Sequence, residues 1–81
     1  MSWNYRVIKQ TSKLGEDWYE FREVYYRKNG KINLWSERAS EPCGGSTEDL
    51  KWCLTQMLEA LEKPVLIEVK RGKNEYLEEM S

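Results

Sequence analysis

The chain has 81 residues, of which 40% are hydrophobic and 33% charged, and its net charge is −1 with no histidine. A chain of this length can bury one small core, so we expect a single globular domain over residues 1–81. With two cysteines and no histidine, the sequence lacks the usual zinc ligands and the usual base of hydrolase triads. We therefore expect no metal, no cofactor and no catalytic activity.

No apolar run approaches the roughly 18 residues of a membrane span, and the N-terminus lacks the basic-then-apolar form of a signal peptide. These features predict a cytoplasmic protein that does not enter the membrane. The two cysteines, Cys43 and Cys53, lie before and within a predicted helix. They are too far apart for a disulfide, and we expect two reduced thiols with Cys53 in the core.

Three strands are predicted in the first half of the chain. Residues 3–9 alternate in polarity, residues 18–27 are rich in aromatic side chains, and residues 31–37 follow the hairpin signal Asn29-Gly30. Two hairpin registers are open. A two-residue turn pairs Tyr25 with Leu34, whereas a three-residue turn with a glycine bulge pairs Tyr26 with Ile32.

We favour the bulged register because it collects four apolar side chains on one face of the sheet. These residues are Val24, Tyr26, Ile32 and Leu34. The opposite face then carries Tyr19, Phe21, Tyr25 and Trp35. A single helix can cover only one face, so one face of the sheet is expected to stay open.

Residues 46–62 have the periodicity of an amphipathic helix. Its predicted inward stripe is Leu50, Cys53, Leu54, Met57, Leu58 and Leu61. Ser46 and Asp49 form a capping pattern at its start, and Pro64 ends it. The β-branched content of residues 65–70 predicts a short fourth strand, and residues 72–81 predict a charged tail with at most one frayed helical turn. The expected fold is α+β, a three-stranded antiparallel sheet followed by one amphipathic helix on one face and a short fourth strand.

Two surfaces are candidates for binding. Trp52 lies on the polar side of the predicted helix with Gln56 and Glu59, unless the C-terminal tail covers it. The open sheet face offers Tyr19, Phe21, Tyr25 and Trp35, with arginines and lysines nearby. We expect a non-catalytic module that binds another protein or a second copy of itself as a homodimer. Single-stranded nucleic-acid binding through the aromatic sheet face is the alternative.

Three stretches resemble small uncharacterised bacterial and phage-type proteins. They are Trp3–Ile8, residues 23–31 with Asn29-Gly30, and Leu58–Leu66. The layout of three strands and a helix opening with Ser46-Thr47-Glu48-Asp49-Leu50 looks like that of HicB-like antitoxin domains, which pair with a small ribonuclease toxin. These resemblances imply an inhibitor or antitoxin-like partner, or a phage-type anti-defence inhibitor protein.

Overall fold

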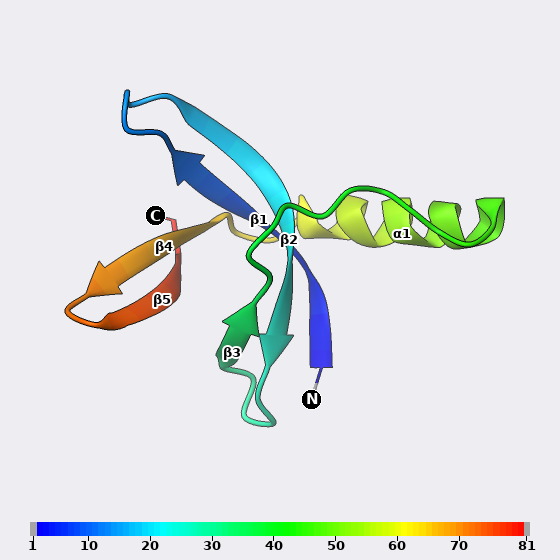
Figure 1. Ribbon diagram of the computed structural model, residues 1–81. Coiled ribbons are helices and arrows are strands. Elements are labelled where there is room, and N and C mark those ends of the chain that lie inside the picture. Colours follow the sequence, from blue (N-terminus) through cyan, green and yellow to red (C-terminus); the bar gives the residue numbers. More distant parts are fainter. Residues whose placement is uncertain (1, 81) are drawn as a thin grey trace.

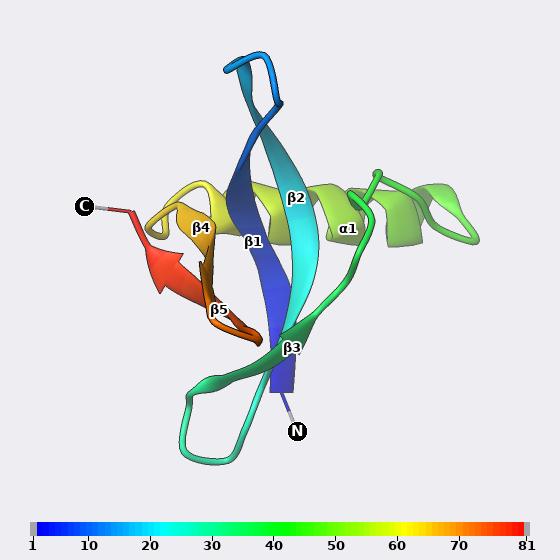
Figure 2. The same ribbon diagram turned by 60° about the vertical axis from the view of Figure 1, so that its left-hand side comes forward.

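The computed structural model describes residues 2–80, which form five strands and one helix. The strands are β1 (Ser2–Thr11), β2 (Asp17–Tyr26), β3 (Ile32–Trp35), β4 (Leu66–Arg71) and β5 (Asn74–Glu79), and the helix is α1 (Thr47–Ala60). The strands form one sheet in the order β3-β2-β1-β4-β5, in which only β1 and β4 pair in parallel. The sheet curls into a nearly closed barrel, and α1 lies outside it (Figures 1 and 2).

The expected three-stranded antiparallel sheet with a short fourth strand is therefore wrong. The connection through α1 returns the chain alongside β1, and a helical crossover of this kind allows β4 to pair in parallel, with Ile8 opposite Leu66. The predicted charged tail forms β5 instead of a frayed helical turn. Its hairpin with β4 turns through Gly72, whose φ of +63° suits a tight two-residue loop.

Opposite charges on β4 and β5, together with the packing of Leu77 on the interior core, favour a strand in this segment. Lys70 lies directly across from Glu75, and Arg71 forms an ion pair with Glu78 at 3.0 Å. Such cross-strand pairs stabilise a sheet, each by a few tenths of a kcal/mol up to about 1 kcal/mol. The residues that suggested a solvated tail are thus partners across a hairpin.

The β2–β3 hairpin combines the two registers that the sequence left open. Tyr26 pairs with Ile32, as a three-residue turn ending at Gly30 requires, and Gly30 has the expected positive φ of +84°. The register then shifts at Asn33, so that Tyr25 faces Leu34 and Val24 faces Trp35. The preferred register therefore holds only next to the turn.

The extra residue at Asn33 exchanges the faces of the two residues that follow it. Trp35 packs against the barrel interior and Leu34 is 48% exposed, the reverse of what we predicted. A one-residue shift moves every later side chain to the opposite face of a strand, which is the physical reason for the error. The interior core consists of Ile8, Val24 and Leu66, with Tyr26, Ile32, Trp35 and Leu77 packed around them.

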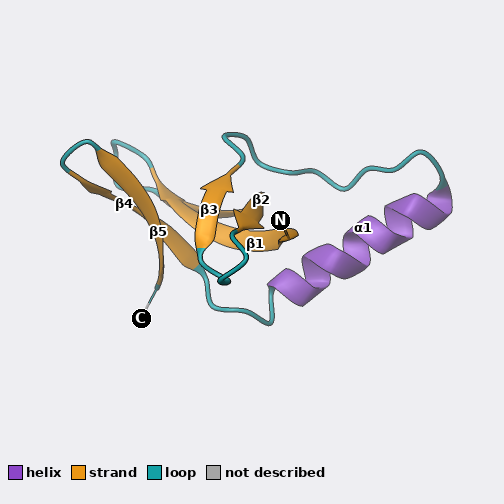
Figure 3. Ribbon diagram, turned by 90° about the horizontal axis from the view of Figure 1, so that it is seen from below, coloured by secondary structure: helices purple, strands orange, loops and turns teal. Residues whose placement is uncertain are grey.

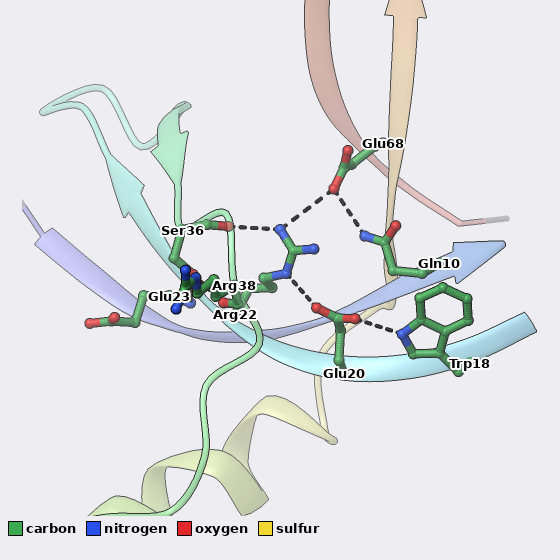
Figure 4. Close-up of polar contacts among 8 residues, drawn as sticks. All are labelled: Gln10, Trp18, Glu20, Arg22, Glu23, Ser36, Arg38 and Glu68. Carbon is green, nitrogen blue, oxygen red and sulfur yellow. Dashed lines mark hydrogen bonds and ion pairs between the residues drawn. The ribbon is translucent and has the colours of Figure 1, made fainter. Parts of the chain in front are cut away.

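A polar network closes the barrel beside this core (Figure 4). The Arg22 guanidinium on β2 donates to Glu20 Oε2 at 2.6 Å and to the carbonyl of Ser36 at 2.7 Å, and lies 3.6 Å from Glu68 Oε1 on β4. Trp18 and Gln10 donate to the same two carboxylates. Arg22 is only 8% exposed, and its partners come from both sides of β1. The network therefore ties β2, β4 and the segment after β3 together across the curved sheet.

Helix α1 begins at the predicted cap, where the Ser46 hydroxyl accepts a hydrogen bond from the Asp49 amide. It packs on the outer face of β1, and its N-terminal part extends beyond the strands (Figure 3). The buried residues of α1 are Cys53, Met57 and Ala60. Cys43 and Cys53 are free thiols, exposed and buried respectively, as predicted.

Only one edge of the predicted inward stripe is covered, which corrects our assignment of its leucines to the core. Leu54, Leu58 and Leu61 are 44%, 64% and 60% exposed. The six apolar positions span a wide arc of the helix, and one curved sheet can contact only part of that arc. The other face of the sheet does not stay open as expected, because it curls around the interior core.

Candidate protein-binding surface

Four aromatic side chains gather where α1 crosses the outer face of the sheet. Trp3 lies at the centre of this aromatic cluster, which also contains Tyr5, Tyr25 and Trp52. Ring centroids are 5.3 Å apart for Trp3 and Tyr5, 6.4 Å for Trp3 and Tyr25, and 6.4 Å for Trp3 and Trp52. The contacts with Tyr5 and Trp52 are edge-to-face, a geometry that aromatic rings favour.

The strand register and the helix position produce this cluster. Trp3 and Tyr5 alternate along β1 and so share its outer face, and Trp3 pairs directly with Tyr25 on β2. The Tyr5 hydroxyl lies 3.5 Å from Cys53 Sγ, which holds α1 over this part of the sheet. Trp52, the next residue before Cys53, therefore reaches Trp3 from the side of the helix.

The two tryptophans of the cluster are open to solvent. Trp3 is 42% exposed and Trp52 is 54% exposed, whereas Tyr5 and Tyr25 are half-buried beneath them. The C-terminal segment that we considered as a cover for Trp52 is instead paired with β4 as β5. Exposed tryptophans supported by packed tyrosines form a rigid apolar surface, the kind of feature that anchors protein contacts.

Acidic side chains lie on the two elements that carry the aromatic cluster on either side of Trp3, β2 and α1. Glu23 accepts a hydrogen bond from the Tyr25 hydroxyl at 3.2 Å. Glu48 and Glu59 precede and follow Trp52 on α1 by four and seven residues, so they share its face of the helix. We call these three carboxylates, Glu23, Glu48 and Glu59, the acidic rim of the cluster.

The tyrosine hydroxyls remain neutral in this setting. The hydrogen bond with Cys53, burial and the charge of Glu23 all raise the pKa of Tyr5 well above its usual range. Burial and the neighbouring Glu23 carboxylate also raise the pKa of Tyr25. Both phenols keep their protons at physiological pH, so the negative charge beside the cluster comes from the carboxylates alone.

The structure brings together only some of the residues predicted for binding. Trp52 and Tyr25 meet through Trp3, Glu59 is exposed on the same side of α1, and Gln56 is half-buried. Tyr19 and Phe21 are also on the outer face of β2, where they line a hollow of about 130 Å³ with Leu61. Leu61 follows Trp52 by nine residues, which at about 100° per residue places it on the opposite side of α1. Tyr19 and Phe21 are thus separated from the aromatic cluster by the helix.

Sequence reasoning missed Trp3 and Tyr5 as members of a binding surface. The alternating polarity of residues 3–9 predicted a strand, but it gave neither residue a partner on the second strand. The five residues between β1 and β2 fix the register that sets Trp3 against Tyr25, and Gly15 with φ of +83° closes that turn. The β1–β2 register, had it been derived from the length of this turn, would have placed Trp3 beside Tyr25 and so identified the cluster.

The aromatic cluster does not line either of the two larger hollows of the molecule. The larger hollows, about 410 and 310 Å³, lie elsewhere, at Lys9 and Glu68 and beside Leu34 on β3. Small-molecule sites are usually concave and mainly apolar, whereas protein contacts use flatter surfaces with aromatic anchors. Within residues 2–80, no group of three or more acidic, cysteine or histidine side chains is placed to hold a metal ion.

Comparisons with protein-family profiles, with curated proteins and with solved structures give no match for this chain. No helix in the described part of the chain combines the length and apolar character needed to cross a membrane.

Proposed function

We propose that the protein is a non-catalytic protein-binding module, and that it binds a basic, apolar segment of a partner through the aromatic cluster. The observation that supports this most strongly is the exposure of Trp3 and Trp52 in mutual contact, beside Tyr25 and its hydrogen-bonded Glu23 carboxylate. Tryptophan is the residue most enriched at the energetic centre of protein interfaces.

The charge of the rim argues for a basic partner. Glu23, Glu48 and Glu59 attract lysine and arginine side chains, and the tryptophan faces can stack on their cationic groups. Apolar side chains of the same segment would cover the indole rings. The combination selects a segment in which large apolar residues alternate with cations.

The arrangement does not favour single-stranded nucleic acid as the ligand. The stacking surface expected from the sequence required Tyr25 and Trp35 on one face, but Trp35 packs in the barrel interior. The carboxylates around Tyr25 would repel phosphates, whereas proteins that bind single strands present a positively charged groove.

The test is a synthetic peptide array in which apolar content and net charge vary independently, followed by calorimetric titration of the selected peptides. We expect the full chain to select peptides that are both basic and apolar. Trp52→Ala should weaken their binding by about tenfold or more, and Glu59→Lys should weaken it while improving binding of acidic counterparts. The matched control is Tyr76→Ala, which removes a 45% exposed aromatic side chain on β5.

The proposal fails if acidic and basic apolar peptides bind equally well, or if Trp52→Ala binds like the wild type. Binding to an oligonucleotide pool that weakens steeply with salt would instead support the nucleic-acid alternative.

A further inference from the structure

The leucine face of α1, defined as Leu54, Leu58 and Leu61, is an apolar surface that the chain does not cover. These residues follow one another at intervals of four and three, so they form a continuous stripe along the helix. Their side chains are 44%, 64% and 60% exposed. The hollow lined by Tyr19 and Phe21 lies at the end of this stripe, beside Leu61.

The accessible surface area of the chain is larger than that of a typical folded monomer of the same mass. The accessible area is 6415 Å² for a mass of 9.7 kDa. A folded monomer of this mass exposes about 5,100 Å². The excess of about 1,300 Å² exceeds the roughly 800 Å² that each partner buries in a standard interface.

The shape of the molecule explains this excess. The radius of gyration is 13.6 Å, compared with about 12 Å for a compact domain of the same length. The extents of 43, 35 and 21 Å reflect the projection of α1 from the barrel (Figure 3). The leucine face runs toward the C-terminal end of α1 and reaches β2 at Leu61, and its side chains are exposed to a partner.

We propose that two copies of the chain form a dimer through the leucine face, with the two α1 helices packed antiparallel about a twofold axis. This surface lies on the opposite side of α1 from the aromatic cluster. The dimer therefore leaves the proposed partner site free, and the two proposals can fail independently.

The charges beside the stripe are complementary to a second copy. Lys51, within α1, and Glu62, in the turn directly after it, flank the two ends of the leucine face in the sequence. In an antiparallel pair that sets Leu54 between Leu58 and Leu61 of the second copy, Lys51 of each chain lies beside Glu62 of the other. Among the ion pairs of residues 2–80, none includes Lys51 or Glu62, so both are available for this contact.

The sheet edges are poorer sites for self-association. Strand β3 has four residues and an irregular register, and both features limit pairing with another strand. Strand β5 carries Glu75, Glu78 and Glu79, which would oppose the same residues of a second copy. The leucine face has no comparable protection.

Light scattering coupled to size exclusion tests the proposal on the full chain over a wide concentration range. We expect twice the 9.7 kDa mass at high concentration and a single chain on dilution. Leu58→Glu should give a single chain at every concentration, with unchanged circular dichroism because Leu58 is exposed. Trp52→Ala, the matched control on the other side of α1, should dimerise like the wild type.

Charge exchange tests the antiparallel arrangement separately. Lys51→Glu should raise the dimer dissociation constant about tenfold, because two attractive contacts become repulsive. Adding Glu62→Lys to the same chain should restore the wild-type value. A wild type that stays a single chain at millimolar concentration, a Leu58→Glu dimer, or a double variant that is no tighter than Lys51→Glu would each overturn the proposal.

Discussion

Met57→Ala and Leu54→Ala, as single variants, should differ in unfolding free energy, because Met57 is on the inward face of α1 and Leu54 on its exposed face. Met57 is 2% exposed against β1, whereas Leu54 is 44% exposed. The two side chains are similar in size and in helix propensity, so the intrinsic effect of alanine on the helix is nearly the same for both. The difference between the two variants therefore reports burial.

The expected magnitudes follow from the exposed fractions. Met57→Ala removes three buried heavy atoms, worth about 2.4 kcal/mol of transfer free energy, and the cavity left behind raises the loss to about 3 kcal/mol. Leu54→Ala removes three carbons that are only about half buried and leaves no closed cavity. It should cost about 1 kcal/mol.

The assay is urea unfolding followed by circular dichroism, at two protein concentrations a hundredfold apart. Self-association shows as a midpoint that depends on concentration, and the comparison uses the dilute sample, in which single chains predominate. If Leu54→Ala costs as much as Met57→Ala under dilute conditions, the helix packs on its leucine stripe. The burial assignment, and with it the dimer surface, would then be wrong.

Two further predictions concern the connection before α1 and the polar network. A Cβ at Gly44 would lie 2.5 Å from the backbone nitrogen of Leu50. Gly44→Ala should therefore lower the free energy of unfolding by about 1 to 3 kcal/mol in the same urea assay. Gly45→Ala is the control and should be nearly neutral, because a Cβ there meets only Asp49 Oδ2 at 3.6 Å. Burial alone would raise the pKa of Glu20, but hydrogen bonds from Arg22 and Trp18 and the Arg22 charge lower it below its usual 4.5. The stabilisation by this carboxylate should therefore be complete above about pH 5 and be lost as the pH falls below 4.5, and Glu20→Gln should remove this part of the pH dependence of the urea midpoint.

The local elements could be predicted from sequence because short-range chemistry determines them. The Ser46 cap and the apolar periodicity define α1, and Asn29-Gly30 defines a turn whose glycine has the required positive φ. Short-range sequence patterns could not predict the parallel pairing of β4 with β1. It depends on where α1 returns the chain, and the curl of the sheet depends on contacts between distant residues, such as Arg22 with Glu68.

The candidate binding surfaces also combine residues that the local sequence identifies with residues that only long-range strand pairing brings together. Trp52 was identifiable because a large aromatic residue stood on a polar helix face, but its neighbour Trp3 required the pairing of β1 with β2. The irregularity at Asn33 left no clear mark in the sequence, because asparagine is common both in turns and in bulges. Trp35 was therefore placed on the wrong face.

The sizes of the side chains on α1 carry information that the apolar pattern alone does not. The buried residues of α1 are Cys53, Met57 and Ala60, and two of them are small, which allows the helix to approach the sheet closely. The larger leucines at positions 54, 58 and 61 face outward. A helix that served only to cover its own sheet would place its largest apolar residues inward, where burial stabilises the fold most. The arrangement in α1, with Met57 inward and three leucines outward, is the one expected if the leucine face packs on a second chain as proposed above.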